Sequence, residues 1–97
     1  MTDSVGPVLD ASEAGRAIVA AIQATNANVT VHDRGAYLRV LVPGRCAVSR
    51  DAIERALGRP FRLPGDLEQL MPSFKGMLTV TTDEVVWAWS GQGGVGK

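Results

Sequence analysis

The 97-residue sequence predicts an α+β fold in a single domain. Several stretches repeat apolar residues at helical spacing between capping and terminating residues, which is typical of amphipathic helices. Other stretches alternate apolar and polar residues, which is typical of half-buried strands. Short polar turns join these strands, and such turns favour antiparallel hairpins over the crossover units of a parallel sheet. We therefore expect antiparallel hairpins packed with about three helices.

The first nine residues show little periodicity and contain Gly6-Pro7, which disfavours regular structure. We expect residues 1–9 to form a flexible arm that orders only on binding, and residues 10–90 to form the domain. The first helix begins at a cap, Asp10 or Ser12, and ends at Asn26. One face of it carries Ala14, Ile18, Ala21, Ile22 and Thr25 at helical spacing.

A hairpin follows this helix. Val29 and Val31 alternate with polar residues before a turn at residues 33–35. The second strand, residues 37–42, places Leu38, Val40 and Val42 on one face, and Pro43-Gly44 ends the hairpin.

The second helix has the clearest boundaries, with Ser49 as the cap and Gly58 as the terminating residue. A short third helix is expected from Asp66 to Met71, stopped by Pro72. A last hairpin pairs residues 76–81 with residues 85–89, and the alternation puts Trp87 and Trp89 on one face.

Composition excludes several classes of function. Ten basic and ten acidic residues cancel, so no net charge attracts nucleic acid or an anionic membrane. The longest apolar runs fall far short of the ~18 residues of a membrane span. With Cys46 as the only cysteine and no secretory pattern at the start, we expect a cytoplasmic protein without an internal disulfide.

The residues available for catalysis are few. One histidine, His32, and one cysteine cannot supply the ligands of a zinc or copper site, so we expect no metal and no bound cofactor. A thiol enzyme would require Cys46 to lie beside His32, and that alternative stays open. The pair Asp83-Glu84 is expected in a solvated turn. The sequence favours an interaction role over catalysis.

The chain ends in GQGGVGK, which contains part of a phosphate-binding loop. Gly91, Gly96 and Lys97 match the motif, but the hydroxyl residue that binds magnesium and the helix that follows are missing. We expect residues 91–97 to be a flexible, glycine-rich tail. A small-ligand or nucleotide-binding module remains the alternative function.

One long segment carries a family resemblance. From Leu57 onward, LGRPFRLPGDLEQLMPSFKGMLTVTTDEVVWAW resembles the effector, or coupling, proteins of soluble bacterial diiron monooxygenases of the toluene, phenol and alkene hydroxylase type. The segments VGP, TNAN, VTVHDRGAYLRVLVPGR and SRDAIERALGRPF occur in the order expected for these proteins. The chain departs from them in a loop that is one residue longer at Pro64–Asp66.

The resemblance implies an α+β regulatory protein without a prosthetic group. Such a protein binds the oxygenase component near its diiron centre and couples oxygen activation to hydroxylation or epoxidation of a hydrocarbon. The same system contains a reductase and often a Rieske ferredoxin.

The resemblance also implies contact residues for the oxygenase: Asn26, Arg34, Arg45, Gln69, Ser73 and Phe74. Three of these have other interpretations. Asn26 fits a helix C-cap, Arg34 a solvated turn, and Phe74 the core, where an aromatic beside a strand is usually found.

Overall fold

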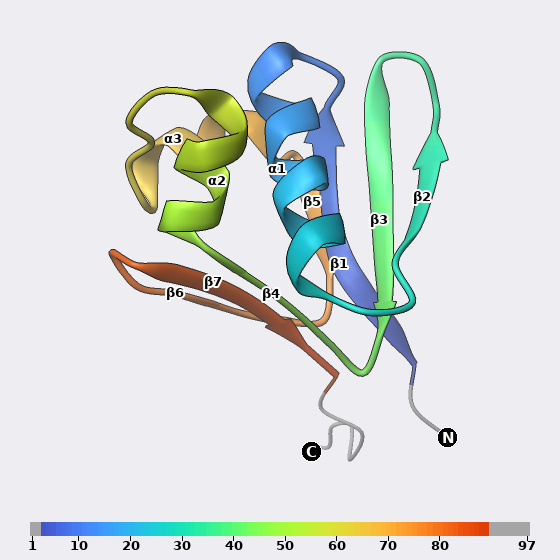
Figure 1. Cartoon of the computed structure of the whole chain (residues 1–97). Coiled ribbons are helices and arrows are strands. Elements are labelled where there is room, and N and C mark those ends of the chain that lie inside the picture. The colour runs from blue at the N-terminus through green and yellow to red at the C-terminus, as the bar shows by residue number, and fades with distance from the viewer. Residues whose placement is uncertain (1–2, 90–97) are drawn as a thin grey trace.

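The computed structural model describes residues 3–89, in which seven strands and three helices are arranged as an α+β fold (Figure 1). The elements in chain order are β1 (Ser4–Asp10), α1 (Glu13–Thr25), β2 (Thr30–Asp33), β3 (Tyr37–Pro43), β4 (Arg45–Ser49), α2 (Arg50–Leu57), α3 (Gly65–Leu70), β5 (Ser73–Lys75), β6 (Met77–Val80) and β7 (Glu84–Ala88). All paired strands of this range are antiparallel, which confirms the predicted fold class.

The strands form two sheets. One has the order β2-β3-β1-β5, and the other has the order β4-β7-β6. Gly44 joins them: its positive φ of 76° turns the chain from β3 directly into β4. The Gly44 N–H donates to the Asp3 carbonyl (2.9 Å), and its carbonyl accepts from Trp89 N–H (2.9 Å). The ends of both sheets are thereby held together.

The predicted arm is wrong for Ser4–Leu9, because these residues belong to β1, a central strand between β3 and β5. Gly6 has a φ of 150°, and a Cβ there would lie 2.3 Å from the Val40 carbonyl oxygen, so only glycine fits so close to β3. Pro7 is fully buried. The Gly-Pro pair that suggested irregular structure is therefore accommodated inside the sheet.

Helix α1 covers the inner face of the four-stranded sheet, with α2 beside it (Figure 1). Ser12 is its N-cap, accepting a hydrogen bond from Gly15 N–H at 3.1 Å, whereas Asp10, the other predicted cap, lies in β1. Ile18 and Ile22 are fully buried against the sheet. The predicted face is confirmed for Ile18, Ala21 and Ile22, whereas Ala14 is half-buried and Thr25 is exposed.

The boundaries of α2 are confirmed. Ser49 Oγ accepts from Ala52 N–H at 3.0 Å, and Gly58 ends the helix in the left-handed conformation with a φ of 83°. Helix α3 lies within one residue of its predicted bounds. Both predicted hairpins are present, but strands β4 and β5 were not predicted.

One apolar core joins both sheets and the three helices. Its largest fully buried side chains include Trp87, Leu9, Ile18, Ile22, Ile53 and Leu67. Trp89 follows the end of β7 and is 38% exposed, so only one of the two tryptophans belongs to the core. Among the helices of residues 3–89, none is both long and apolar enough to cross a bilayer.

Candidate protein interface

A groove of about 650 Å³ lies on the outer face of the four-stranded sheet. We call it the sheet groove. Its lining residues come from β1, β3, β5 and the adjoining turns: Gly6, Val8, Arg34, Tyr37, Arg39, Leu41, Pro72, Ser73, Phe74 and Lys75. The groove lies on the side of the sheet opposite α1, since β1 and β3 direct alternate residues to opposite faces.

The shape of the groove follows from residue size along β1. Gly6 and Val8 are the outward positions of this strand, so little side-chain volume stands above the middle of the sheet. Longer side chains border them on β3, including Arg39 and Leu41. In the register of the sheet, Arg39 lies opposite Val8 and Val8 lies opposite Ser73, so these residues form one row across three strands.

The sheet groove exposes aromatic surface. Tyr37 is 43% exposed and Phe74 is 42% exposed, and both line it. Val8 and Leu41 also line the groove and add half-buried aliphatic surface. An antiparallel sheet with one open face usually carries polar residues on that face, so the apolar lining of the groove departs from the usual pattern.

The charged side chains that line the groove are all basic: Arg34, Arg39 and Lys75. Lys75 Nζ lies 3.1 Å from Asp3 Oδ2 at one end, and this hydrogen bond holds the pKa of the Asp3 carboxyl below its ordinary value. Neither Arg34 nor Arg39 forms an ion pair with any residue between 3 and 89. The groove therefore combines apolar surface with unpaired positive charge.

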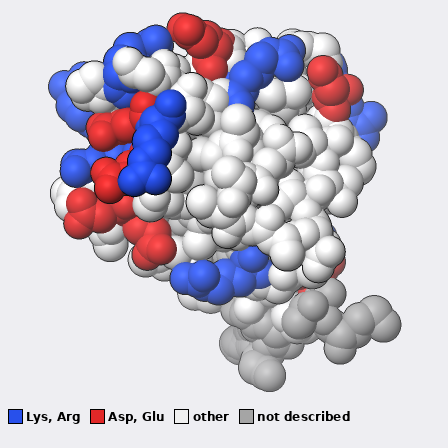
Figure 2. All heavy atoms as spheres, viewed as in Figure 1, with Lys and Arg blue, Asp and Glu red and all other residues white. Residues whose placement is uncertain are grey.

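The surface over α2 and α3 is charged differently. Figure 2 shows Lys, Arg, Asp and Glu side chains of both signs gathered over α2 and α3. Several of these form ion pairs, among them Arg59 with Glu13 (3.2 Å) and Arg62 with Asp66 (3.5 Å). Such paired charges attract a partner less than unpaired charges of one sign.

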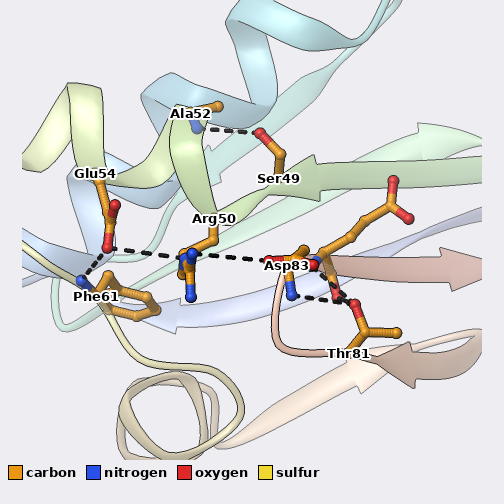
Figure 3. Close-up of polar contacts among 8 residues, drawn as sticks. Ser49, Arg50, Ala52, Glu54, Phe61, Thr81 and Asp83 are labelled. Carbon is orange, nitrogen blue, oxygen red and sulfur yellow. Dashed lines mark hydrogen bonds and ion pairs between the residues drawn. The ribbon is translucent and has the colours of Figure 1, made fainter.

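One polar cluster on this side has a structural role (Figure 3). Glu54 Oε2 accepts a hydrogen bond from Phe61 N–H at 2.8 Å and lies 4.0 Å from Arg50 Nε. The Arg50 guanidinium also forms an ion pair with the Asp83 carboxylate, and the Arg50 backbone N–H donates to the Asp83 carbonyl at 2.8 Å. The cluster ties the start of α2 to the β6–β7 turn and to the loop before α3.

The thiol-enzyme alternative is wrong. Cys46 is fully buried in β4, whereas His32 is exposed on β2 of the other sheet, so the two do not form a nucleophile and base pair. Burial raises the pKa of the Cys46 thiol to about 12, which leaves it protonated and unreactive. Within residues 3–89, no three His, Cys, Asp or Glu side chains gather where they could hold a metal ion.

Residues 3–88 match the MmoB/DmpM family. The chain belongs to this family. The effector subunit of the alkene monooxygenase system of Xanthobacter autotrophicus (strain ATCC BAA-1158 / Py2) is 39% identical to it over 85 residues, which are 86% of this chain and 83% of that protein. The resemblance inferred from the sequence is thereby confirmed.

Two solved structures are similar to this fold. A chain from the structure of a phenol hydroxylase–regulatory protein complex superposes with a TM-score of 0.78 at 18% identity, covering 90% of this chain and 98% of that one. A chain from a second such complex gives 0.75 at 20% identity, with 89% and 99% covered. At these identities the likeness concerns the fold.

Three of the six contact residues predicted for this family member line the sheet groove: Arg34, Ser73 and Phe74. The structure brings them together from the β2–β3 turn and from β5, although they lie about forty positions apart in the sequence. The core interpretation of Phe74 is wrong, because its side chain is 42% exposed. The solvated-turn interpretation of Arg34 agrees with its exposure.

The other three predicted contact residues lie elsewhere. Asn26 is the C-cap of α1, and its side chain also binds the backbone of Ala47. Arg45 is exposed on β4 of the other sheet. Gln69 borders a smaller hollow of about 250 Å³ between α3 and the loop that follows α2.

None of the remaining groove residues was predicted as a contact with the oxygenase. Tyr37 and Leu41 carried a signal, because they are apolar residues at the outward positions of an alternating strand. Gly6, Val8 and Lys75 carried none, since their place in the groove depends on the pairing of β1 with β3 and β5. The tail motif at residues 91–97 lies outside the described residues.

Proposed function

We propose that this protein is a non-catalytic effector. It binds the oxygenase component of a multicomponent diiron monooxygenase and promotes coupled oxygen activation and hydrocarbon hydroxylation or epoxidation. The observation that carries the proposal is the MmoB/DmpM match over residues 3–88, joined to 39% identity with an alkene monooxygenase effector subunit. Because this relative belongs to an alkene monooxygenase system, we propose alkene epoxidation as the reaction.

The chemistry of this chain is consistent with the proposal. Its only cysteine is a buried, protonated thiol, and its only histidine is exposed on a strand of the other sheet. The reacting groups and the iron belong to the oxygenase. A reductase, and a Rieske ferredoxin in some systems, would supply electrons, and all components would work in the cytoplasm.

The mechanism requires only a difference in affinity. An effector that binds one oxygenase conformation more tightly shifts the population toward it by that ratio, and about 1.4 kcal/mol of difference shifts the equilibrium tenfold. No group of the effector needs to touch substrate. The effect on the oxygenase should therefore saturate once each active site has one effector bound.

Two measurements test this proposal. The purified protein alone should oxidise no alkene or aromatic substrate when supplied with the electron-transfer proteins. Mixed with its cognate oxygenase, it should sediment as a complex with one effector per active site. Substrate oxidation by the protein alone, or the absence of any complex at concentrations of tens of micromolar, would contradict the proposal.

A further inference from the structure

We propose that the sheet groove is the surface through which this protein binds the oxygenase. Its occupant is an oxygenase segment that carries acidic side chains beside an apolar or aromatic one. The inference rests on the proposed function and assigns a place and a chemistry to the contact. It follows from three properties of the groove: its lining, its charge and its rigidity.

The lining is of the kind that favours association. Tyr37 and Phe74 are two of the four large apolar side chains that are exposed in the described structure, and both line the groove together with Val8 and Leu41. Tyrosine and arginine are enriched among the residues that dominate interface energies. Exposing apolar surface to water on the outer face of a sheet is unfavourable, and covering it with a partner lowers the free energy.

The charge selects an acidic partner. Arg34, Arg39 and Lys75 line the groove, and no acidic side chain of the described residues lines it with them. Asp3 pairs with Lys75 at one end, and Asp10 lies opposite Tyr37 in the β1–β3 register but outside the lining. The two arginines therefore remain available to carboxylates, which they bind in bidentate geometry.

The same charge argues against a second copy of this chain as the occupant. In a symmetric dimer the same patch faces itself, so Arg34 and Arg39 would approach their own counterparts. Like charges placed opposite each other across an interface are repulsive. An acidic partner has no such cost.

The groove is also preorganised. Its floor is β1, which is paired on both edges and packed against α1, so the lining does not need to order on binding. A volume of about 650 Å³ accommodates a few side chains of a partner. A protein complex of standard size buries roughly 800 Å² on each partner, so the groove would be the centre of a larger contact.

The test uses the full-length protein and its cognate oxygenase, with dissociation constants measured by titration calorimetry at low and high salt. Arg39→Glu should raise Kd about tenfold or more and should weaken the salt dependence. Arg16→Glu makes the same charge change on α1, on the other side of the sheet, and should change Kd less than about threefold. Tyr37→Ala should raise Kd about tenfold, whereas Met77→Ala removes an exposed apolar side chain outside the groove and should have little effect.

A second measurement does not depend on loss of binding. Because Cys46 is buried, an environment-sensitive fluorophore can be attached selectively at Ser73→Cys in the groove or at Thr79→Cys outside it. Oxygenase should shift the emission of the first label to shorter wavelength and protect it from a soluble quencher. The second label should not respond.

The outcomes separate the two proposals. If wild-type protein binds the oxygenase but the groove variants bind as tightly as the controls and the Ser73→Cys label stays exposed, the groove assignment is overturned and the effector function stands. If the groove variants bind the oxygenase as tightly as wild type but Arg16→Glu does not bind it, the groove assignment is overturned too. If the protein alone forms a dimer that Arg39→Glu dissociates, the occupant is a second copy. If wild-type protein binds no oxygenase, both proposals fail.

Discussion

Asn26 fastens the C-terminal end of α1 to strand β4. Its Nδ2 donates to the Ala47 carbonyl at 2.7 Å and to the Ile22 carbonyl at 2.9 Å, and its Oδ1 accepts from Ala47 N–H at 3.2 Å. The side-chain amide thus satisfies both backbone groups of Ala47 as a neighbouring strand would. We predict that Asn26→Ala destabilises the fold, and that the role of this residue is structural.

The magnitude follows from the bonds removed. Each hydrogen bond contributes about 0.5–1.5 kcal/mol net, so three would contribute about 1.5–4.5 kcal/mol. Asn26 is half-buried, and water can replace part of what is lost, so we expect a loss of about 2–3 kcal/mol in the free energy of unfolding. For a domain of this size that loss lowers Tm by roughly 10–20 °C. Asn26→Asp should cost at least as much at neutral pH, since it places a carboxylate oxygen against two carbonyl oxygens.

Urea and thermal unfolding, followed by circular dichroism, measure these differences. Gln23→Ala is the matched control, because it also removes an amide, from the exposed face of α1, and should change stability by no more than about 0.5 kcal/mol. The loss in Asn26→Asp should shrink at low pH, where the protonated carboxyl can donate one hydrogen bond. Equal stabilities of Asn26→Ala and Gln23→Ala would refute the structural role.

Three other predictions concern stability and reactivity. Gly6→Ala should lower the free energy of unfolding by more than about 3 kcal/mol or prevent folding, because the added Cβ would lie 2.3 Å from a β3 carbonyl oxygen. Gly35→Ala, where the added Cβ meets open space, should lower it by about 1 kcal/mol, and chemical denaturation of the two variants measures the difference. Cys46, with a thiol pKa of about 12, should react with a soluble disulfide reagent at pH 8 roughly a thousandfold more slowly in the folded protein than in urea, and equal rates would contradict its burial. The backbone N–H of Arg62 donates a hydrogen bond to the Asp66 carboxylate and lowers its pKa. The stabilisation by this carboxylate is therefore present above the ordinary pKa of aspartate and is lost as the pH falls through the lowered value. Asp66→Asn should therefore be less stable than wild type at pH 7 but not at pH 2, as unfolding curves at the two pH values can show.

Local signals in the sequence predicted the elements that depend on local chemistry. The cap at Ser49 and the left-handed Gly58 defined α2, and strict alternation from Tyr37 to Val42 defined β3 with its buried face. These signals act within a few residues, so they can be recognised without knowing the fold.

Elements that depend on distant partners were not predicted. Gly6-Pro7 suggested irregular structure, yet β1 is a central strand because β3 and β5 pair with it and α1 covers its apolar side. Strand β5 has only three residues and is exposed throughout, so it carries no alternation that could indicate a strand.

The candidate interface was partly predictable. The family resemblance pointed to Arg34, Ser73 and Phe74, which meet in the groove. Arg39 and Lys75 complete its charge only through the register of β1 with β3 and β5, and register is a property of the folded sheet. Asn26 was predicted as a contact residue, but its hydrogen bonds to Ala47, which span 21 positions, fix it to the protein itself.

The claim that this protein is an effector is tested most directly by product formed per reducing equivalent consumed, measured against effector concentration with the cognate oxygenase and its electron-transfer proteins. The ratio should rise with added effector and level off when there is about one effector per active site, because the effect requires occupancy and not turnover. An unchanged rate, ratio and product distribution at every effector concentration would contradict the effector function.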